Sequence, residues 1–473
     1  MTTHALCRSW LSSILGIGTL LLSVMVVPAR SQSPAASAPI RDEKGFHTAE
    51  VWRVIEEKAK AKPGSNEHVA VLDRPKYQAY YAERYSSWKP PPPPLPAGKL
   101  RNLSETPTSP RFPLQGKQWP VHPGDASICL WEDDKLAAVS ISIDDNQLQD
   151  VPFWKELSGR YGGFKLTFNL IVTPIDTDFR GRKHMFGTWE QWRELVRPDA
   201  EFRIHVASHS MTHMNCPVAA DGWPGLEWEA AESKRLMEEH LQTAVKMFVA
   251  PGPGVADFNI DLNLWREPVA KHYAAARMGA QKLINPANQI DYFKIQTVSS
   301  LGLIMERKWE TEPRYAHAAS QHPDNLLNPD PKNPNYRGWL NLYFHGIGGG
   351  RDWDTKYASV TLAFEWIQRH RDDLWVGYMD DIALYGQERD TGTVTTISAT
   401  DRRIELELTS RMDPNVFDYP LTVKVRLPDS WRKCQATQAG QAIPLMPVSR
   451  EGASYALVKA RPDRGLIVIA PVP

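Results

Sequence analysis

Two histidines four positions apart, His209 and His213, stand in the motif His-Ser-Met-Thr-His between a short apolar run and a turn. Two imidazoles at this spacing reach one metal ion if the backbone turns between them, and each offers a neutral ring nitrogen to zinc. No Glu follows His209, so the motif differs from the His-Glu-x-x-His of zinc proteases. The pattern predicts part of a metal centre that needs a third ligand and a proton-transfer pair.

Two adjacent carboxylates, Asp144 and Asp145, are the first candidates for the missing groups. They follow an apolar run, 135–143, that has the pattern of a buried strand. Side chains that are adjacent at a strand end diverge, so one carboxylate can face a metal while the other faces the attacking water. His345 stands at the same position after another apolar run, 339–344. Each pattern is common by itself, and only their combination indicates a site.

The elements that must position these residues alternate between strands and helices, which is typical of a parallel sheet or barrel. Catalytic groups on such folds lie at the carboxyl ends of the strands, where Asp144, Asp145 and His209 are expected. A sharp turn is expected at 248–254. The expected strands are 135–143, 165–172, 202–208, 339–344 and 374–376, and the expected helices are 151–161, 188–196, 227–247, 263–279 and 360–370.

Three motifs resemble those of the polysaccharide deacetylases, the NodB homology group that is also called carbohydrate esterase family 4. Residues 142–146, Ser-Ile-Asp-Asp-Asn, resemble the family's first motif, Thr-Phe-Asp-Asp-Gly. Residues 209–213 match the second motif, His-Ser/Thr-x-x-His, and residues 342–345 match the late Leu-x-x-His motif. The stretch 187–192 is also similar to the family. The resemblance covers roughly 136–389 and does not reach either end of the chain.

The resemblance implies a role for each candidate residue. Asp144 would be the general base and His345 the general acid. Asp145, His209 and His213 would bind a divalent metal, for which zinc is favoured. The resemblance also implies the fold, a distorted TIM-like (β/α) barrel.

The chain departs from the family pattern at several positions. Many members carry an Arg in the third motif that orients the base, whereas residues 249–252 resemble a Tyr-Pro-x-Gly variant without Arg. The group that orients Asp144 is therefore unassigned, and a backbone amide near Gly252 is a candidate oxyanion donor. Asn146 replaces the usual Gly. The Asp-x-x-Asp-Trp motif has only a weak counterpart at Asp291-Tyr292.

The two ends of the chain have different patterns from the middle. Residues 1–29 combine a charge, an apolar run and a small-residue exit, which predicts a signal peptide and a secreted or periplasmic protein; an uncleaved anchor is the alternative. Residues 30–98 are expected to form an extension and a proline-rich linker. The catalytic domain is expected at 126–389. Residues 390–473 alternate with period two, which predicts a small all-β, sandwich-like domain that binds carbohydrate or has only a structural role.

Composition limits the partners of the protein. The net charge is zero and the isoelectric point is near 7.2, so nothing indicates nucleic-acid binding. No later stretch is long and apolar enough to suggest a stable membrane span in the mature chain. Removal of the signal would leave Cys129, Cys216 and Cys434, which allow at most one internal disulfide. Cys216 lies near His213, but a buried or paired thiol is favoured over a metal ligand.

These features together predict a secreted metal-dependent hydrolase that removes acetyl groups from a polysaccharide or oligosaccharide. N-acetyl groups are favoured, and the substrate-binding residues are unknown. An O-acetyl polysaccharide esterase would use the same groups, so the motifs do not separate the two. The alternative of a different class is a glycan-binding protein that keeps the barrel and has weak or no catalysis, which the missing Arg favours.

Overall fold

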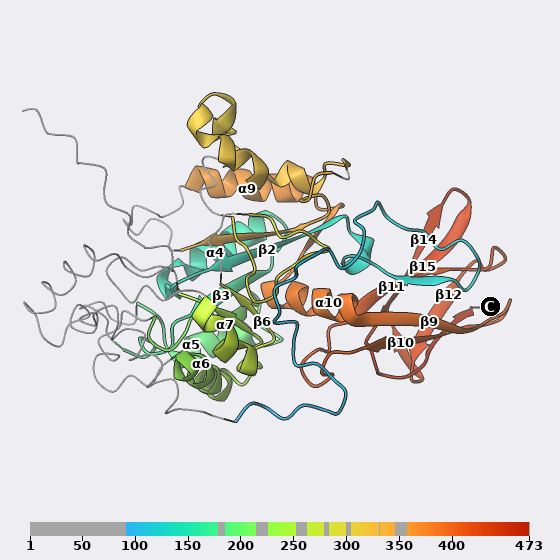
Figure 1. Cartoon of the computed structure of the whole chain (residues 1–473), viewed down its shortest axis with the longest axis horizontal. Coiled ribbons are helices and arrows are strands. Elements are labelled where there is room, and N and C mark those ends of the chain that lie inside the picture. The colour runs from blue at the N-terminus through green and yellow to red at the C-terminus, as the bar shows by residue number, and fades with distance from the viewer. Residues whose placement is uncertain are drawn as a thin grey trace, which may run out of the picture. The chain divides into compact units, whose positions relative to one another are not determined.

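The computed structural model describes residues 91–177, 185–213, 226–251, 263–278, 283–298, 304–330, 332–345 and 357–472. Their main parts are a curled parallel sheet with helices around it and a β-sandwich, with one helix, α10, between them (Figure 1). The fold prediction of a distorted (β/α) barrel with a C-terminal all-β domain is confirmed. No helix within the described ranges has the length and apolar character needed to cross a bilayer.

The barrel sheet consists of parallel strands in the order β6-β5-β4-β3-β2-β7, and β8 pairs with the first half of β2. Strand β2, which pairs with β3, β7 and β8, is buried along its whole length, as expected for a strand covered on both faces. The strands are β2 (Ala137–Ile143), β3 (Leu166–Leu170), β4 (His205–Ser208), β5 (Met247–Val249), β6 (Ala275–Arg277), β7 (Trp339–Phe344) and β8 (Leu374–Val376).

The register of the sheet places the carboxyl ends of several strands at one level. Ile143 pairs with Phe344, so the residues that follow β2 and β7 begin side by side. Leu170 pairs with Ser208, which brings the end of β4 level with the end of β3. The residues directly after these strands therefore meet at one edge of the sheet.

A segment without regular strands, 285–298, fills the space between β6 and β7. The backbone of Ala276 in β6 accepts a hydrogen bond from Ile295 and donates one to Tyr292. At the other side, Asn285 and Val298 form bridges to Trp339 and Leu342 of β7. The segment thus connects the two edge strands and closes the curled sheet.

The helices confirm most sequence predictions and correct two of them. Thr188 caps α5 through a capping box with Gln191, as its position suggested. The predicted helices 227–247 and 263–279 are too long, because each ends early and is followed by a short buried strand, β5 or β6. The expected turn at 248–254 likewise begins inside β5. The helices are α4 (Val151–Arg160), α5 (Trp189–Val196), α6 (Leu226–Leu241), α7 (Asn263–His272), α9 (Tyr357–Arg369) and α10 (Met379–Thr391), and the 3-10 helices are η1 (Glu132–Asp134), η2 (Leu148–Asp150), η4 (Lys308–Glu310), η5 (Pro313–Gln321) and η6 (Pro323–Leu326).

The C-terminal domain has two antiparallel sheets, ordered β1-β11-β15-β14 and β13-β12-β16-β10-β9. The first of its strands, β1, comes from before the barrel and pairs with β11. Alternate residues of β10, β11 and β16 form the apolar core. The strands are β1 (Ala126–Ile128), β9 (Gly392–Ala399), β10 (Ile404–Ser410), β11 (Leu421–Arg426), β12 (Cys434–Gln438), β13 (Gln441–Ile443), β14 (Leu445–Arg450), β15 (Ala453–Ala460) and β16 (Ile467–Pro471).

The helix α10 joins the barrel to the sandwich and was not predicted. It packs on β2 and β6 of the barrel and on β9, β10 and β11 of the sandwich, so nearly every side chain is buried (Figure 1). A helix buried all round has no amphipathic period by which the sequence could reveal it.

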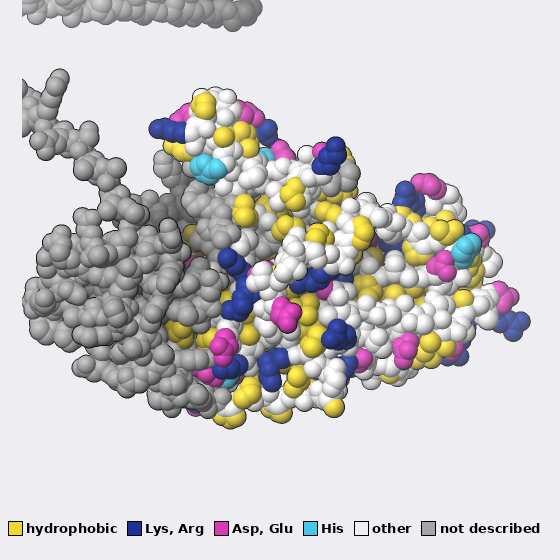
Figure 2. Space-filling view, in the orientation of Figure 1, with side chains coloured by type: hydrophobic (Ala, Val, Ile, Leu, Met, Phe, Trp, Pro, Cys, Tyr) yellow, Lys and Arg dark blue, Asp and Glu magenta, His cyan; other side chains and the backbone are white. Residues whose placement is uncertain are grey.

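Charges of both signs are interspersed over the visible surface of the described residues (Figure 2). Cys129 and Cys434 are both free thiols, and Cys216 lies outside the described residues.

Candidate metal and hydrolytic site

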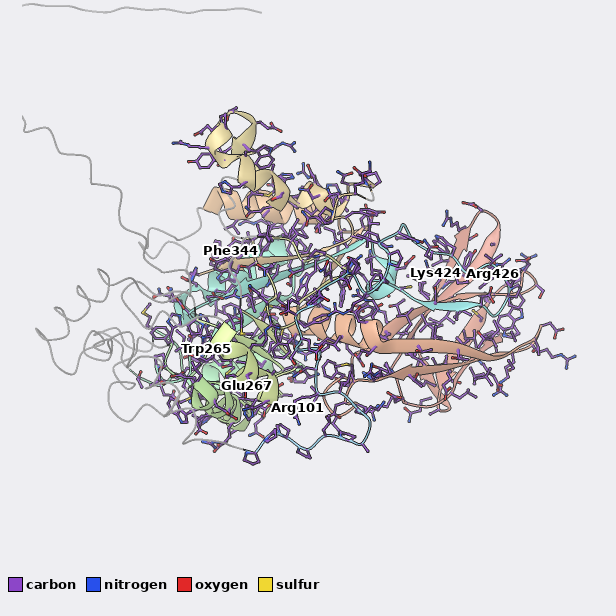
Figure 3. The ribbon with its side chains drawn as sticks, viewed as in Figure 1. Arg101, Trp265, Glu267, Phe344, Lys424 and Arg426 are labelled. Carbon is purple, nitrogen blue, oxygen red and sulfur yellow. The ribbon has the colours of Figure 1, made fainter. Side chains whose placement is uncertain are left out.

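The five residues predicted for the site lie together at the carboxyl edge of the barrel sheet. Asp144 and Asp145 follow β2, His209 and His213 follow β4, and His345 follows β7. Figure 3 labels Phe344, the last residue of β7, directly before His345. The aligned strand ends place side chains from three distant parts of the sequence within a few ångströms of one another.

Asp145, His209 and His213 form a cluster that fits a metal ion. Asp145 Oδ1 lies 3.6 Å from His209 Nε2 and 3.5 Å from His213 Nε2. Ligands at roughly 2.0–2.2 Å around a tetrahedral zinc are separated by about 3.4 Å, so these distances agree with a shared ion. All three ligand atoms lie within 4.8 Å of one another. Two imidazoles and one carboxylate are also the ligand types of catalytic zinc sites.

The ring of His209 is oriented for metal binding. Its Nδ1 donates a hydrogen bond to the backbone carbonyl of Val249, at 2.9 Å, which leaves Nε2 as the lone-pair nitrogen toward Asp145. The side chain is buried, and burial lowers its pKa to about 4. The neutral imidazole, which is the form that binds metal, is therefore the form present at neutral pH.

The loop that carries both histidines has an unusual backbone that is supported by its neighbours. Ser210 and His213 both have positive φ, 68° and 55°, which turns the chain sharply between the two imidazoles. Ser210 Oγ accepts a hydrogen bond from the His213 amide at 3.0 Å. The buried carboxylate of Glu229, on α6, accepts hydrogen bonds from the Thr212 amide at 3.0 Å and the Thr212 hydroxyl at 2.6 Å. Helix α6 thereby holds the loop in place.

Asp144 is buried beside the cluster and has two polar neighbours of its own. Asn169 Nδ2, from β3, donates to Asp144 Oδ1 at 2.6 Å, and Arg277 Nη2, from β6, donates to Oδ2 at 2.5 Å. Burial favours the neutral acid, but Arg277, His209 and His345 outweigh it and hold the pKa of Asp144 well below its usual value. Asp144 is therefore a carboxylate and can accept a proton.

Arg277 is the functional residue that sequence reasoning missed. It occupies the position for which no orienting group could be assigned, and it reaches Asp144 from β6 instead of from the third motif. Its Nη1 also donates to Ser142 Oγ at 3.2 Å, and its guanidinium lies 5.0 Å from the centre of the Tyr343 ring. These contacts fix the guanidinium against the base. The chain thus supplies an arginine for the base although the third motif lacks one.

His345 follows β7, approaches the same Asp144 oxygen that Arg277 contacts, and is more accessible than His209. Its Nε2 is 4.0 Å from Asp144 Oδ2, the same distance as His209 Nε2 from that oxygen. Its side chain is 16% exposed, compared with 2% for His209. A histidine close to the base but open to solvent is placed to give a proton to a leaving group that enters from outside.

Asn146, which replaces the family's Gly, ties the first loop to its neighbours. Its side-chain amide donates to the backbone carbonyls of Ile171 and Phe186, at 3.3 Å and 3.2 Å, and its carbonyl accepts from the Ile171 amide at 3.0 Å. Asp145 and Asn146 have φ of 67° and 32°, so the loop is held in a conformation that is unfavourable for most residues. Asn is among the residues that tolerate this region.

The weak motif candidate Asp291-Tyr292 is not part of the site. Asp291 forms an ion pair with Arg266 at 2.7 Å, and the Tyr292 hydroxyl donates to Asp390 at 2.8 Å. The pair therefore belongs to the segment that closes the barrel. The proposed oxyanion donor near Gly252 lies outside the described residues.

No family model matches the chain. A curated protein of Bacillus sp. with the name gellan lyase is 30% identical over 389 residues, which is 80% of this chain. The chain spans only 14% of that relative's length, so the named activity belongs to a much longer protein.

The similar solved structures include three proteins with low identity to the chain. One is the CE4 domain of a multidomain xylanase from the hindgut metagenome of Trinervitermes trinervoides, with 14% identity, TM-score 0.28, and 52% of this chain and 89% of that chain covered. A CE4 family pseudoenzyme from Bacillus anthracis has 14% identity and TM-score 0.27, covering 52% and 66%. The peptidoglycan deacetylase PdaC from Bacillus subtilis, as a mutant, has 12% identity and TM-score 0.26, covering 52% and 89%.

Two of these three solved structures are named as CE4 family members, and one of those two is a pseudoenzyme.

Proposed function

We propose that this protein is a secreted, metal-dependent hydrolase of the polysaccharide deacetylase type, which removes acetyl groups from an acetylated polysaccharide or oligosaccharide. The observation that supports it most is the arrangement around Asp144. This ionised base lies beside the cluster of Asp145, His209 and His213. Arg277 contacts its carboxylate from β6, and His345 lies 4.0 Å from the carboxylate after β7. Base, acid and metal ligands at one strand edge are what acetyl hydrolysis requires.

A divalent metal held by Asp145, His209 and His213, with zinc favoured, would polarise the acetyl carbonyl and lower the pKa of the attacking water. Asp144 takes a proton from that water as its oxygen adds to the carbonyl carbon. Arg277 and Asn169 keep the carboxylate oriented through both of its oxygens. His345 then gives a proton to the departing nitrogen or oxygen as its bond to the carbonyl carbon breaks, and acetate leaves.

The same groups can cleave an amide or an ester. N-acetyl groups are our favoured substrate, and the O-acetyl esterase is the second candidate because the same groups serve both reactions. The gellan lyase similarity adds gellan to the polysaccharides worth testing. The alternative of a glycan-binding protein without catalysis depends on the missing arginine of the third motif. Arg277 contacts Asp144 from β6, so this argument for the alternative no longer applies.

The test is acetate release by the metal-loaded protein from three substrate groups: N-acetylated glycans, O-acetylated glycans and gellan. Asp144→Asn is the matched variant, since it keeps the shape of the side chain and removes the base. We expect turnover by the wild type on at least one group and a loss of at least about 10²-fold in the variant. Glycan binding without turnover on any group would instead support the binding protein.

A further inference from the structure

A cavity of about 410 Å³ lies far from the hydrolytic site, where the segment 112–118 crosses between the barrel and the sandwich. Its volume is within the range of small-molecule sites, and it is partly open to solvent. One lining residue, Arg337, lies just before β7, while His345 lies just after it. At about 3.3 Å per strand residue, the two are on the order of 20 Å apart.

The wall of the cavity combines an apolar part with several polar and charged side chains. The apolar part could pack against the carbon face of a ring. Asp134, Ser127 and two glutamines could bind hydroxyl groups. The lining residues are Phe112, Pro113, Leu114, Gln115, Gly116, Gln118, Ser127, Ile128, Cys129, Leu130, Asp134, Arg337, Arg389, Gly392, Val394 and Lys424.

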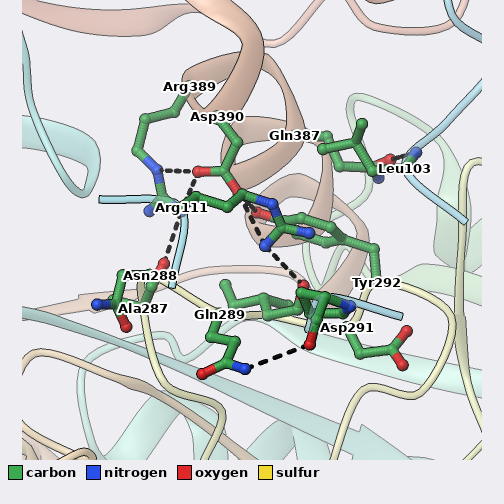
Figure 4. A network of polar contacts seen from close by, with 12 residues as sticks. Leu103, Arg111, Ala287, Asn288, Gln289, Asp291, Tyr292, Gln387, Arg389 and Asp390 are labelled. Carbon is green, nitrogen blue, oxygen red and sulfur yellow. Dashed lines mark hydrogen bonds and ion pairs between the residues drawn. The ribbon is translucent and has the colours of Figure 1, made fainter. Parts of the chain in front are cut away.

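Two of the three cations that line the cavity are already paired with carboxylates. Lys424, labelled on the sandwich in Figure 3, forms a buried ion pair with Asp134 at 2.7 Å. Arg389 forms an ion pair with Asp390 at 2.6 Å, and the same carboxylate accepts a hydrogen bond from the Tyr292 hydroxyl and pairs with Arg111 at 3.5 Å (Figure 4). Both of these cavity cations therefore have a carboxylate at ion-pair distance.

Arg337 is different, because it has no ion-pair partner within the described part of the chain. Its Nε donates to the Leu136 carbonyl at 3.3 Å and its Nη1 to the Gln115 carbonyl at 2.9 Å, and both acceptors are neutral. The residue is only 4% exposed and has a φ of 58°, which is costly for a side chain of this size. Burial lowers the pKa of Arg337, and the nearby Asp134, whose carboxylate is paired with Lys424, offsets only part of this effect.

We propose that this cavity binds a uronic acid, with the carboxylate on Arg337 and the sugar ring on the apolar wall. A single buried guanidinium without an ion-pair partner of its own suits a monoanion better than a phosphate dianion, and its planar shape suits a carboxylate. The polar wall provides partners for several hydroxyl groups, which a fatty acid would leave unused. A free uronate and a uronate unit within a glycan share this chemistry.

Calorimetric titration of the full chain tests the proposal. The metal is removed with a chelator first, so that carboxylates cannot bind at the hydrolytic site. The ligands are glucuronate, a glucuronate-containing oligosaccharide, and glucose as the neutral match. We expect saturable binding of glucuronate or the oligosaccharide, much weaker binding of glucose, and a loss of at least tenfold in affinity in Arg337→Met. Binding of the oligosaccharide alone would identify the glycan as the source, and binding of glucuronate alone would identify the free acid. Equal binding would show that one uronate unit makes all of the contacts.

Two variants separate recognition from a structural effect. Arg432→Met removes a charge from an exposed position of the sandwich and should leave the affinity unchanged. Val394→Phe narrows the cavity without changing its charge and should also weaken binding at least tenfold. Thermal unfolding of ligand-free Arg337→Met shows whether this variant is folded at the temperature of the titration. The proposal is overturned if the wild type binds no uronate at millimolar concentration, if glucose binds as well, or if both cavity variants keep full affinity.

Discussion

Arg277 Nη2 lies 2.5 Å from Asp144 Oδ2, and this contact joins β6 to the end of β2 at the centre of the proposed site. Both side chains are at least nine-tenths buried, so the pair is shielded from screening by solvent ions. The contact gives the base a fixed orientation and a stable negative charge. The predictions below test this relationship and the groups around it.

Arg277→Met should lower kcat by about 10²-fold or more, because Asp144 loses the partner that orients it and keeps it ionised. Metal content should stay at one ion per chain, since Arg277 is not a ligand. Steady-state kinetics with metal analysis measures both. Arg266→Met is the control, because it breaks an ion pair with Asp291 outside the site. A value of kcat within threefold of wild type for Arg277→Met would contradict the role of the pair.

His345→Ala should affect substrates according to their leaving groups. Loss of a general acid should slow release of an amine or alkoxide by about 10²-fold. Release of 4-nitrophenolate from 4-nitrophenyl acetate needs no proton, so it should change by less than about fivefold. Asp144→Asn should slow both reactions, which separates base from acid. His317→Ala, at an exposed position, is the control. Equal losses on both substrates would argue against His345 as the acid.

Glu229→Gln should weaken metal binding by about 10–100-fold, because Glu229 accepts two hydrogen bonds from Thr212 in the loop between the histidines. At saturating metal, kcat should remain within a few-fold of wild type. Competition with a chromophoric chelator measures the affinity. Glu232 lies on the surface of the same helix and, among the described residues, pairs with Arg235 alone. Glu232→Gln should therefore leave the metal affinity unchanged. An unaltered affinity in Glu229→Gln would show that the loop does not depend on α6.

Glu388→Gln should stabilise the fold in a pH-dependent way. Glu388 is 1% exposed on α10, has no ion-pair partner among the described residues, and burial raises its pKa to about 9. In the unfolded chain Glu388 ionises above about pH 4.5, whereas in the folded protein it stays protonated up to about pH 9. The free energy of unfolding of the wild type therefore falls as the pH rises from about 4.5 to about 9. The advantage of Gln should be near zero at pH 4.5 and on the order of 3 kcal/mol at pH 7.

Denaturant unfolding at several pH values measures this advantage. The exposed Glu156 supplies the control, since Glu156→Gln should show no such pH dependence. A difference between wild type and Glu388→Gln that does not grow from pH 4.5 to pH 8 would show that Glu388 is ionised in the fold.

The sequence predicted those parts of the molecule in which local pattern and tertiary environment agree. The strand 339–344 and the capping of α5 by Thr188 are examples. The five candidate site residues were recognisable because the motifs place them directly after such strands. The structure brings all five together, while their catalytic roles stay predictions.

The short strands and the contacts of the base could not be predicted from the sequence, because they depend on burial in the fold and not on a local pattern. The Ala-Ala-Arg of β6 and the Met-Phe-Val of β5 have no alternation, and both follow strong helices. The pattern therefore predicts a helix through β6, and the end of a helix followed by a sharp turn at β5. That error concealed Arg277, since an arginine at the end of a predicted helix gives no sign of facing a carboxylate. Asn169 was missed in a similar way, because a polar residue within a buried strand gains its meaning only from its neighbour Asp144.

The most direct test of the central claim is acetate release measured against metal content. Wild-type protein is assayed as loaded, after chelation, and after zinc is added back, beside His209→Ala in all three states. If Asp145, His209 and His213 bind one ion together, chelation should abolish the activity of the wild type and added zinc should restore it. His209→Ala should neither bind the metal tightly nor release acetate in any of the three states. Activity that survives chelation, or a fully active His209→Ala, would contradict the metal-dependent mechanism.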